Sequence, residues 1–392
     1  MDEEKFNSSV KYLFILSQIF CLTPISPFIK NYNQHENLKV KCLYFAWSVF
    51  WILLMSVIGF YITYVLRGMA KEGPLKMITG IIYIALFLSN VIFLINNIVK
   101  RNNFPKIMNT FWKVDNTLMP RCGVRVYEKE KLCSIKHITV VCLLYIALNV
   151  SLCCALGSTS IYSITFNFTA NLPFLVNGIM SIHFNTLVKK LKKRLKIIND
   201  ILESYTKATH STKWKTPRKI INFLEDSSEE SVNRQPGEIQ LIQSVYIDLY
   251  NTKELINSTY GITIVFEILT CYSLSVTAVI GGIDAATETI DVLVIIFNTF
   301  LLAYVFLMLA WILLKCDQVF DESKKIISNV LKLMVGNDIS QDVKCDLNIF
   351  LSMMRDMPLQ FTPCGLFTLN LPFLCSTVGV ICTYVVVMIQ IN

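Results

Sequence analysis

Charged residues are scarce in this chain. Asp, Glu, Lys and Arg make up 16% of its 392 residues, whereas 54% of the residues are hydrophobic. A typical soluble domain carries about 25% charged residues. The composition therefore excludes a single soluble domain and indicates a polytopic membrane protein, in which several apolar segments cross the bilayer.

Motifs that carry catalytic or cofactor chemistry are also missing, since the sequence contains no GxGxxG, GxxxxGK[ST], HExxH or GxSxG. His35, His137, His183 and His210 lack the spacing of a metal site, and the 13 cysteines include no CxxC pair. The net charge of +8 comes from basic residues beside apolar runs, not from a basic face with interleaved aromatics. We therefore expect no enzymatic activity, no cofactor, no metal and no nucleic-acid partner.

A cleavable signal peptide is missing as well. Asp2, Glu3 and Glu4 stand where a signal peptide carries positive charge, and the apolar stretch 12–29 contains prolines and no small-residue cleavage site. We interpret this stretch as an interfacial amphipathic segment that lies on the membrane.

Long apolar runs are abundant. A membrane-spanning helix needs about 20 mostly apolar residues. Seven runs approach or exceed this length, at 42–66, 75–99, 138–156, 168–188, 260–283, 290–314 and 371–391. We therefore predict an all-α polytopic fold with seven transmembrane helices.

The basic residues predict the orientation of these spans. The segments 1–41, 100–136, 189–258 and 315–370 contain all 36 Lys and Arg residues except Arg67, Lys71 and Lys76. By the positive-inside rule these segments are cytoplasmic, which places the N-terminus inside and the C-terminus outside. The sequon at Asn167 then falls in an outer loop, so Asn167 is a candidate glycosylation site.

The predicted cytoplasmic segments carry helical periodicity. An apolar stripe continues the fourth span as an amphipathic helix, and it consists of Leu187, Leu191, Leu195, Ile198 and Leu202. Further helical stretches are expected at 239–256, 319–334 and 343–357, with a polar linker at 211–237. These helices pack either against each other or against neighbouring subunits. The expected organisation is thus an N-terminus at 1–41, six spans at 42–314, cytoplasmic helices at 315–370 and a last span at 371–392.

The last apolar run contains a polar stripe. Ser376, Thr383 and Gln390 repeat every seven residues and share one helical face with Gly379. Because an unpaired amide in lipid costs several kcal/mol, this face has to meet protein or water. It therefore forms either a helix–helix hydrogen bond or the lining of a pore.

Polar and aromatic residues also occur within the other spans. Glu267 is an acidic residue well inside a span, and we expect it to pair with a basic residue of the inner loops. A mixture of rings and amides in the outer halves of spans two to six suits a pocket for a small polar or amphipathic ligand. The candidate pocket residues are Tyr83, Phe87, Asn149, Asn171, Asn177, Tyr272, Asn298 and Tyr304.

The end of the chain resembles a known family. The segment TYVVVMIQI at 383–391 is similar to the TYhhhhhQF signature (h, hydrophobic) that closes the last helix of insect gustatory receptors, except that Ile391 replaces Phe. The segments FTPCGLFTLN at 361–370, LKKRLKIIN at 191–199, LINSTYG at 255–261 and YLFILSQIFCLTPIS at 12–26 also resemble that family in order. Together these segments extend the resemblance over most of the chain.

This resemblance implies a gustatory receptor of chemosensory neurons, located in the plasma membrane. The family consists of tetrameric ligand-gated cation channels, so the expected assembly is a homotetramer or a heteromer with related receptors, anchored by the cytoplasmic helices at 315–370. The expected ligand is a tastant such as a sugar or a bitter compound, and the other partners are permeating cations and membrane lipid. The resemblance assigns the pore and gate to the last helix, at Thr383, Tyr384, Gln390 and Ile391. Val387, one turn below Ile391, is an additional candidate for the narrow section. The alternatives are a heptahelical receptor that couples to G protein and a solute transporter.

Overall fold

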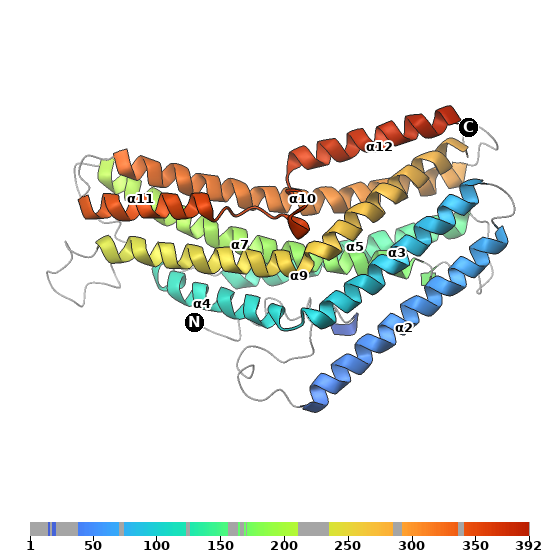
Figure 1. Cartoon of the computed structure of the whole chain (residues 1–392), viewed down its shortest axis with the longest axis horizontal. Helices are drawn as coiled ribbons and strands as arrows, with labels where there is room; N and C mark the ends of the chain where they lie inside the picture. Colours follow the sequence, from blue (N-terminus) through green and yellow to red (C-terminus); the bar gives the residue numbers. More distant parts are fainter. Residues whose placement is uncertain are drawn as a thin grey trace.

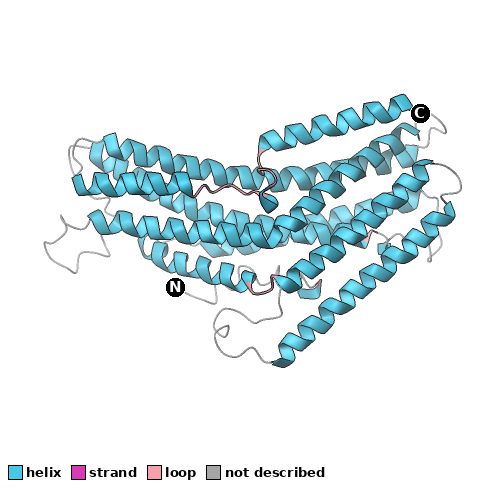
Figure 2. Cartoon of the chain, viewed as in Figure 1, coloured by secondary structure: helices cyan, strands magenta, loops and turns pink. Residues whose placement is uncertain are grey.

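The computed structural model describes residues 15, 18–20, 38–69, 74–122, 126–155, 164, 168–169, 171–210, 235–284, 292–335 and 341–391. This part of the chain is helical and contains no strand, as Figure 2 shows. The helices are α2 (Leu38–Met69), α3 (Pro74–Val99), α4 (Asn103–Cys122), α5 (Val126–Ala155), α7 (Leu172–His210), α9 (Gln235–Asp284), α10 (Val292–Val335), α11 (Gln341–Asp356) and α12 (Leu371–Ile391), with a short 3₁₀ turn, η5 (Pro363–Gly365), before α12. The all-α prediction is confirmed.

The predicted spans coincide with seven of these helices. They fall, in order, on α2, α3, α5, α7, α9, α10 and α12. Over the described residues, four helices are long and apolar enough to cross a membrane by length and composition, namely α2, α5, α9 and α10. A fifth span arises if α3 is joined to α4 across a 62° bend, and Leu371–Val387 of α12 is a shorter apolar helix. In α7 the apolar part runs directly into lysines from Lys189 onward, which lowers the hydropathy of the whole helix.

Three of the long helices extend far beyond their apolar parts. The second half of α7, the first half of α9 and the second half of α10 gather with α4 and α11 at one end of the molecule, on the left in Figure 1. We call this part the helical extension. The predicted apolar stripe of α7 packs inside it, because all five of its side chains are buried.

Helix α4 lies in the segment 100–136, where no helix was predicted. Its apolar side chains follow a helical spacing and are buried, at Phe104, Ile107, Met108, Phe111, Val114 and Leu118. This periodicity was a usable signal in the sequence. It was missed because the segment is too polar to count as a span.

The start of α9 also differs from the prediction. The linker was expected to run to Gly237, but α9 begins at Gln235, so Pro236 and Gly237 lie in its first turn. Proline is tolerated there because the first amide groups of a helix have no intrahelical acceptor. The remainder of this linker and most of the predicted interfacial segment 12–29 lie outside the described residues, although the carbonyl of Ile19 accepts a hydrogen bond from Trp47 Nε1 at 3.1 Å.

Helix α12 lies at the edge of the bundle beside α9 and α10 (Figure 1). The turn before it has left-handed backbone at Cys364 (φ 50°) and Gly365 (φ 72°). This turn packs on α9 at Gly261, where a Cβ atom would lie 3.2 Å from the Cys364 nitrogen. Asn370 then caps α12, since its Oδ1 accepts the Phe373 amide at 3.0 Å. The last helix is therefore fixed to the bundle mainly through its first turns.

Candidate functional site

The two faces of α12 have different surroundings. One face packs on the bundle, with Thr377 and Ile381 buried and Phe373 half-buried. The predicted polar stripe lies on the other side, and Ser376, Gly379, Thr383 and Gln390 are exposed. The hydroxyl groups of Ser376 and Thr383 donate to carbonyls of their own helix, at Pro372 and Gly379. Among the described residues, the stripe therefore makes no helix–helix hydrogen bond.

Thr377 makes the polar contact between α12 and the bundle. The Tyr272 hydroxyl of α9 donates to Thr377 Oγ1 at 3.0 Å, and the Thr377 hydroxyl lies 2.8 Å from the Phe373 carbonyl. Thr377 was not singled out from the sequence, because it lies off the polar stripe, on the opposite face of the helix. This hydrogen bond joins a predicted pocket residue to the predicted pore helix.

The other residues assigned to the pore are placed as follows. Tyr384 and Val387 are exposed, with 60% and 43% of their surface accessible. The side chain of Ile391 lies outside the described part, although its backbone ends α12. An apolar helix with so much exposed surface fits a membrane or a contact with another chain, not water.

The predicted pocket residues mostly link one helix to another. Asn171 donates to Asn149 at 3.0 Å, and both amides are buried where α5 meets the start of α7. The Tyr304 hydroxyl of α10 donates to the Phe174 carbonyl at 2.9 Å. Its oxygen would lie 3.1 Å from a Cβ at Gly178, so the glycine makes room for this contact.

The remaining pocket residues lie on other helix contacts. Asn298 donates to the Val294 carbonyl and packs on Gly281, while Phe87 packs on Gly59 of α2. Asn177 is half-buried and its carbonyl accepts from Ser181. The side chain of Tyr83 is outside the described part, as is the whole of Asn167. Asn149 and Asn171 are thus the predicted pocket residues that the structure brings into direct contact with each other.

Glu267 does not have the partner that was expected. Its Oε1 accepts a hydrogen bond from Ser181 of α7 at 2.5 Å, and among the described residues it forms no ion pair. Its Oε2 has no hydrogen-bond partner in that part of the chain. The expected pairing with a basic loop residue is not found among the described residues, where α7 supplies a hydroxyl group to Glu267 instead.

More polar atoms surround the crossing of α7 and α9. Thr263 lies one helical turn before Glu267, and Asn185 one turn after Ser181, and both side chains are buried without a partner among the described residues. Nearby, His183 Nδ1 and the Tyr260 hydroxyl share a hydrogen bond, and the His183 ring packs against Phe104. These contacts were not predicted, because a single polar residue within an apolar run does not show which distant helix it will contact.

A buried ion pair lies where the helical extension meets the bundle. Arg194 of α7 bonds Asp115 of α4, and both side chains are 4% exposed. The guanidinium also donates to the Lys190 carbonyl at 2.7 Å and lies 4.4 Å from the centre of the Phe111 ring. This pair joins the unpredicted helix α4 to the central helix α7.

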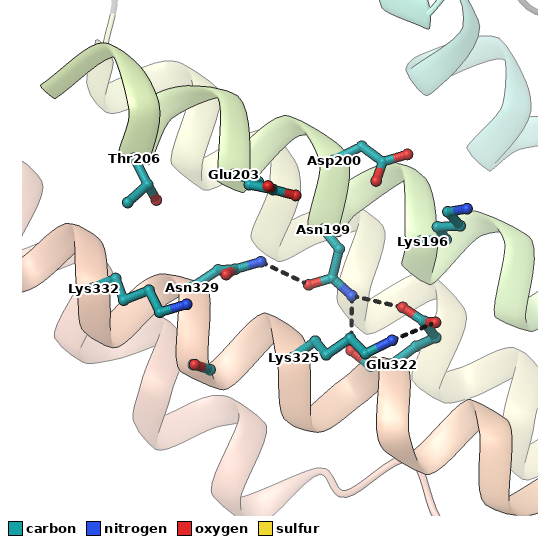
Figure 3. A pocket seen from close by; sticks show the side chains of 10 residues that line it. Lys196, Asn199, Asp200, Glu203, Thr206, Glu322, Lys325, Asn329 and Lys332 are labelled. Carbon is teal, nitrogen blue, oxygen red and sulfur yellow. Dashed lines mark hydrogen bonds and ion pairs between the residues drawn. The ribbon is translucent and has the colours of Figure 1, made fainter. Parts of the chain in front are cut away.

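The helical extension contains a polar cavity of about 560 Å³ between α7 and α10 (Figure 3). Asn199 donates to the backbone and the carboxylate of Glu322, at 2.8 and 3.1 Å, and accepts from Asn329 at 3.2 Å. Lys325 pairs with Glu322 at 3.1 Å. Burial raises the pKa of Asp200 at the rim, Lys196 lowers it, and Glu203 and Glu322 raise it further. Acidic and basic groups balance in this cavity, so it does not select a ligand of one charge.

Among the described residues, no three or more His, Cys, Asp or Glu side chains are grouped so that they could hold a metal ion. The side chains that the structure brings together are instead hydroxyl, amide and single carboxyl groups on helix contacts. Such groups can orient a small molecule or hold water, and they offer no set of reacting groups.

Comparisons with known proteins agree with this arrangement. The family model described as 7tm Chemosensory receptor matches residues 10–392. The fold is similar to that of the insect olfactory receptor OR5 from Machilis hrabei, with a TM-score of 0.65 and 16% identity over 100% of each chain. The same receptor in complex with eugenol gives a TM-score of 0.66, again at 16% identity over 100% of each chain. A search of curated protein sequences found no match.

Proposed function

The chain belongs to the 7tm chemosensory receptor family, and from this membership we propose that it is a gustatory receptor that acts as a ligand-gated, non-selective cation channel. The gustatory assignment rests on the last nine residues of α12, which are similar to the TYhhhhhQF signature. In this proposal a tastant binds in the outer half of the helix bundle and opens a central pore lined by α12.

The exposed polar stripe of α12 is the observation that carries the channel proposal. Ser376, Thr383 and Gln390 find no interhelical partner within the described chain, yet they lie on an apolar helix. Polar side chains that face hydrocarbon are costly, so the stripe needs another surface. Four copies of α12 around a water-filled axis supply that surface, because each stripe then faces the pore.

The gate in this proposal lies at Gln390 and Ile391. Gln390 provides a ring of amides at the outer mouth, and Ile391 provides a hydrophobic constriction that closes by excluding water. Isoleucine is smaller than the phenylalanine of the family signature, so this constriction is expected to seal less tightly.

Orientation and assembly follow from the same proposal. The N-terminus and the helical extension are cytoplasmic, since nearly all basic residues lie there, and the C-terminus is extracellular. The receptor resides in the plasma membrane of chemosensory neurons as a homotetramer or with related subunits. Asn167 is exposed to the glycosylation machinery in this orientation.

Recording currents tests the proposal. The chain is expressed alone in cells, and sugars and bitter compounds are applied one at a time. We expect one class to evoke a cation current, Gln390→Ala to change the relative permeability of Na⁺, K⁺ and Ca²⁺, and Ile391→Ala to raise the current without ligand.

The matched control is Val378→Ala, an exposed position on the same helix that lies well around the axis from the polar stripe. It should leave permeability and basal current unchanged. Unaltered permeability and basal current in both the Gln390 and Ile391 variants would remove α12 from the pore. Saturable uptake of a solute without current would favour a transporter instead.

A further inference from the structure

Three ends of apolar runs meet at one place in the structure. His137 directly precedes the predicted span 138–156 on α5, Lys189 directly follows the span 168–188 on α7, and Lys315 directly follows the span 290–314 on α10. Lys189 and Lys315 are close enough to act electrostatically on His137. Basic groups from three helices therefore converge at the level where the hydrophobic core of a bilayer ends.

Gln318 connects two of the lysines in this cluster. Its Oε1 lies 3.2 Å from Lys192 Nζ of α7 and 3.4 Å from Lys315 Nζ of α10. One uncharged oxygen thus serves as an acceptor for two ammonium groups that repel each other. Asp317 is adjacent to Gln318 on α10. A bound anion with several oxygen atoms would relieve the repulsion.

The cluster borders an apolar surface. Val140 and Leu143 of α5 and Leu307 and Leu314 of α10 are exposed large side chains on the bundle side of the cluster. The Trp311 ring lies edge-on to His137, with ring centres 4.8 Å apart. Tryptophan is enriched at membrane–water interfaces, where one side of its ring contacts lipid and its N–H group remains hydrated.

We propose that His137, Lys189, Lys192 and Lys315 form a binding site for the phosphate headgroup of an anionic phospholipid. The acyl chains lie on the exposed apolar face of α5 and α10. The phosphate oxygens accept hydrogen bonds from the lysines and replace Gln318 as their shared acceptor. This inference rests on the proposed orientation, since anionic lipids are concentrated in the cytoplasmic leaflet.

A lipid is favoured over a soluble anion because exposed apolar side chains lie on α5 and α10, the same helices that carry His137 and Lys315. A free phosphate would use the lysines and leave the exposed leucines and valines unused. A lipid uses both, and it joins the ends of three helices where α7 and α10 leave the bundle for the helical extension.

Binding to the purified full-length protein tests the proposal. The probe is fluorescent short-chain phosphatidylinositol 4,5-bisphosphate, and the protein is held in nanodiscs of phosphatidylcholine. We expect saturable binding that weakens about 30-fold in the double variant Lys192→Gln with Lys315→Gln. Short-chain phosphatidylcholine should not compete.

The matched control is Lys324→Gln, an exposed lysine on α10 that pairs with Asp321 at 3.7 Å in the helical extension. It should bind the probe as the unmodified protein does. Gel filtration and helical content are compared first, so that binding is measured only on folded variants. If the double variant misfolds, Lys315→Gln alone is tested in its place.

Three results would overturn the assignment. These are equal affinity of the double variant and the unmodified protein, equal competition by phosphatidylcholine, and binding of free inositol 1,4,5-trisphosphate as tight as that of the lipid. The readout is binding without a tastant, so it stays informative if no ligand-evoked current is found.

Discussion

At the scale of single residues, two buried carboxyl groups have opposite surroundings. Asp115 bonds the guanidinium of Arg194, whereas Glu267 has a serine hydroxyl at one oxygen and no described partner at the other. Removing one member of a buried ion pair leaves an uncompensated charge and costs about 3–5 kcal/mol. A buried carboxylate without a cation destabilises the folded state. Removing the charge of Glu267 should therefore raise the free energy of unfolding, whereas removing that of Asp115 should lower it.

We therefore expect Glu267→Gln to preserve or raise the thermal stability of the purified protein. The amide keeps the shape and can still accept a hydrogen bond from Ser181, while the charge is removed. Asp115→Asn should instead destabilise the protein by about 3 kcal/mol, because Arg194 then lies buried without its anion. Melting curves of the detergent-purified variants, followed by intrinsic fluorescence, give both signs in one experiment.

A matched control is Asp321→Asn, which removes an exposed carboxylate that pairs with Lys324 at 3.7 Å. Its melting temperature should not change, because exposed pairs contribute little. A large loss of stability in Glu267→Gln would show that the carboxylate is held by a cation that the described residues do not supply.

The sequence identified part of this residue-level arrangement. It placed Glu267 inside a span and Thr383 and Gln390 on one face of the last helix, because composition and the period of a helix are local properties. It did not identify Ser181 as the partner of Glu267, nor Thr377 as the contact of α12. Both depend on how helices distant in the sequence cross, and that is set by the packing of the whole bundle.

At the scale of elements, the Tyr272–Thr377 hydrogen bond is the polar link between α9 and α12 in the described bundle. If α12 lines the pore, this link transmits movement of the bundle to it. A hydrogen bond of this kind contributes about 0.5–1.5 kcal/mol. A change in its strength between closed and open states should therefore alter the gating equilibrium by a similar amount.

We expect Tyr272→Phe to shift the tastant concentration for half-maximal current about threefold to tenfold, with ion permeability unchanged. Concentration–response curves measure the shift, and reversal potentials measure permeability. Thr377→Val should produce a similar shift, and the double variant should shift no further than either single variant, because both remove one interaction.

Tyr64→Phe is a suitable control, because Tyr64 lies on α2 and is 70% exposed. Its curve should coincide with that of the unmodified receptor. Additive shifts in the double variant would mean that the two side chains act separately, and the link would then play no part in gating.

Helices were predictable where the hydrophobic pattern of the local sequence was strong. Apolar runs located the seven long helices, and the leucine stripe from Leu187 to Leu202 predicted the extension of α7. Helix α4 was missed because its segment is too polar to count as a span, although its apolar residues follow a helical spacing. The left-handed turn at Cys364 was not predictable, since only the neighbouring Gly365 is a residue that favours positive φ.

At the scale of the whole molecule, the orientation in the membrane decides on which side the end of α12 and the basic cluster lie. In the proposed orientation, seven crossings put the two termini on opposite sides, and the lysine distribution puts the helical extension in the cytoplasm. The polar end of α12 at Gln390 then faces the outside, as the mouth of a pore requires. The basic cluster of His137, Lys189, Lys192 and Lys315 then faces the anionic inner leaflet.

Epitope tags test this orientation directly. One tag follows Asn392, a second precedes Met1, and a third is inserted into the segment 211–234. We expect antibodies to label only the C-terminal tag on intact cells and all three tags after permeabilisation, with currents retained to show that the tagged chains still fold. Labelling of the N-terminal tag on intact cells would reverse the topology. The channel proposal would then lose its outer mouth at Gln390, and the lipid site would face the leaflet that is poor in anionic lipid.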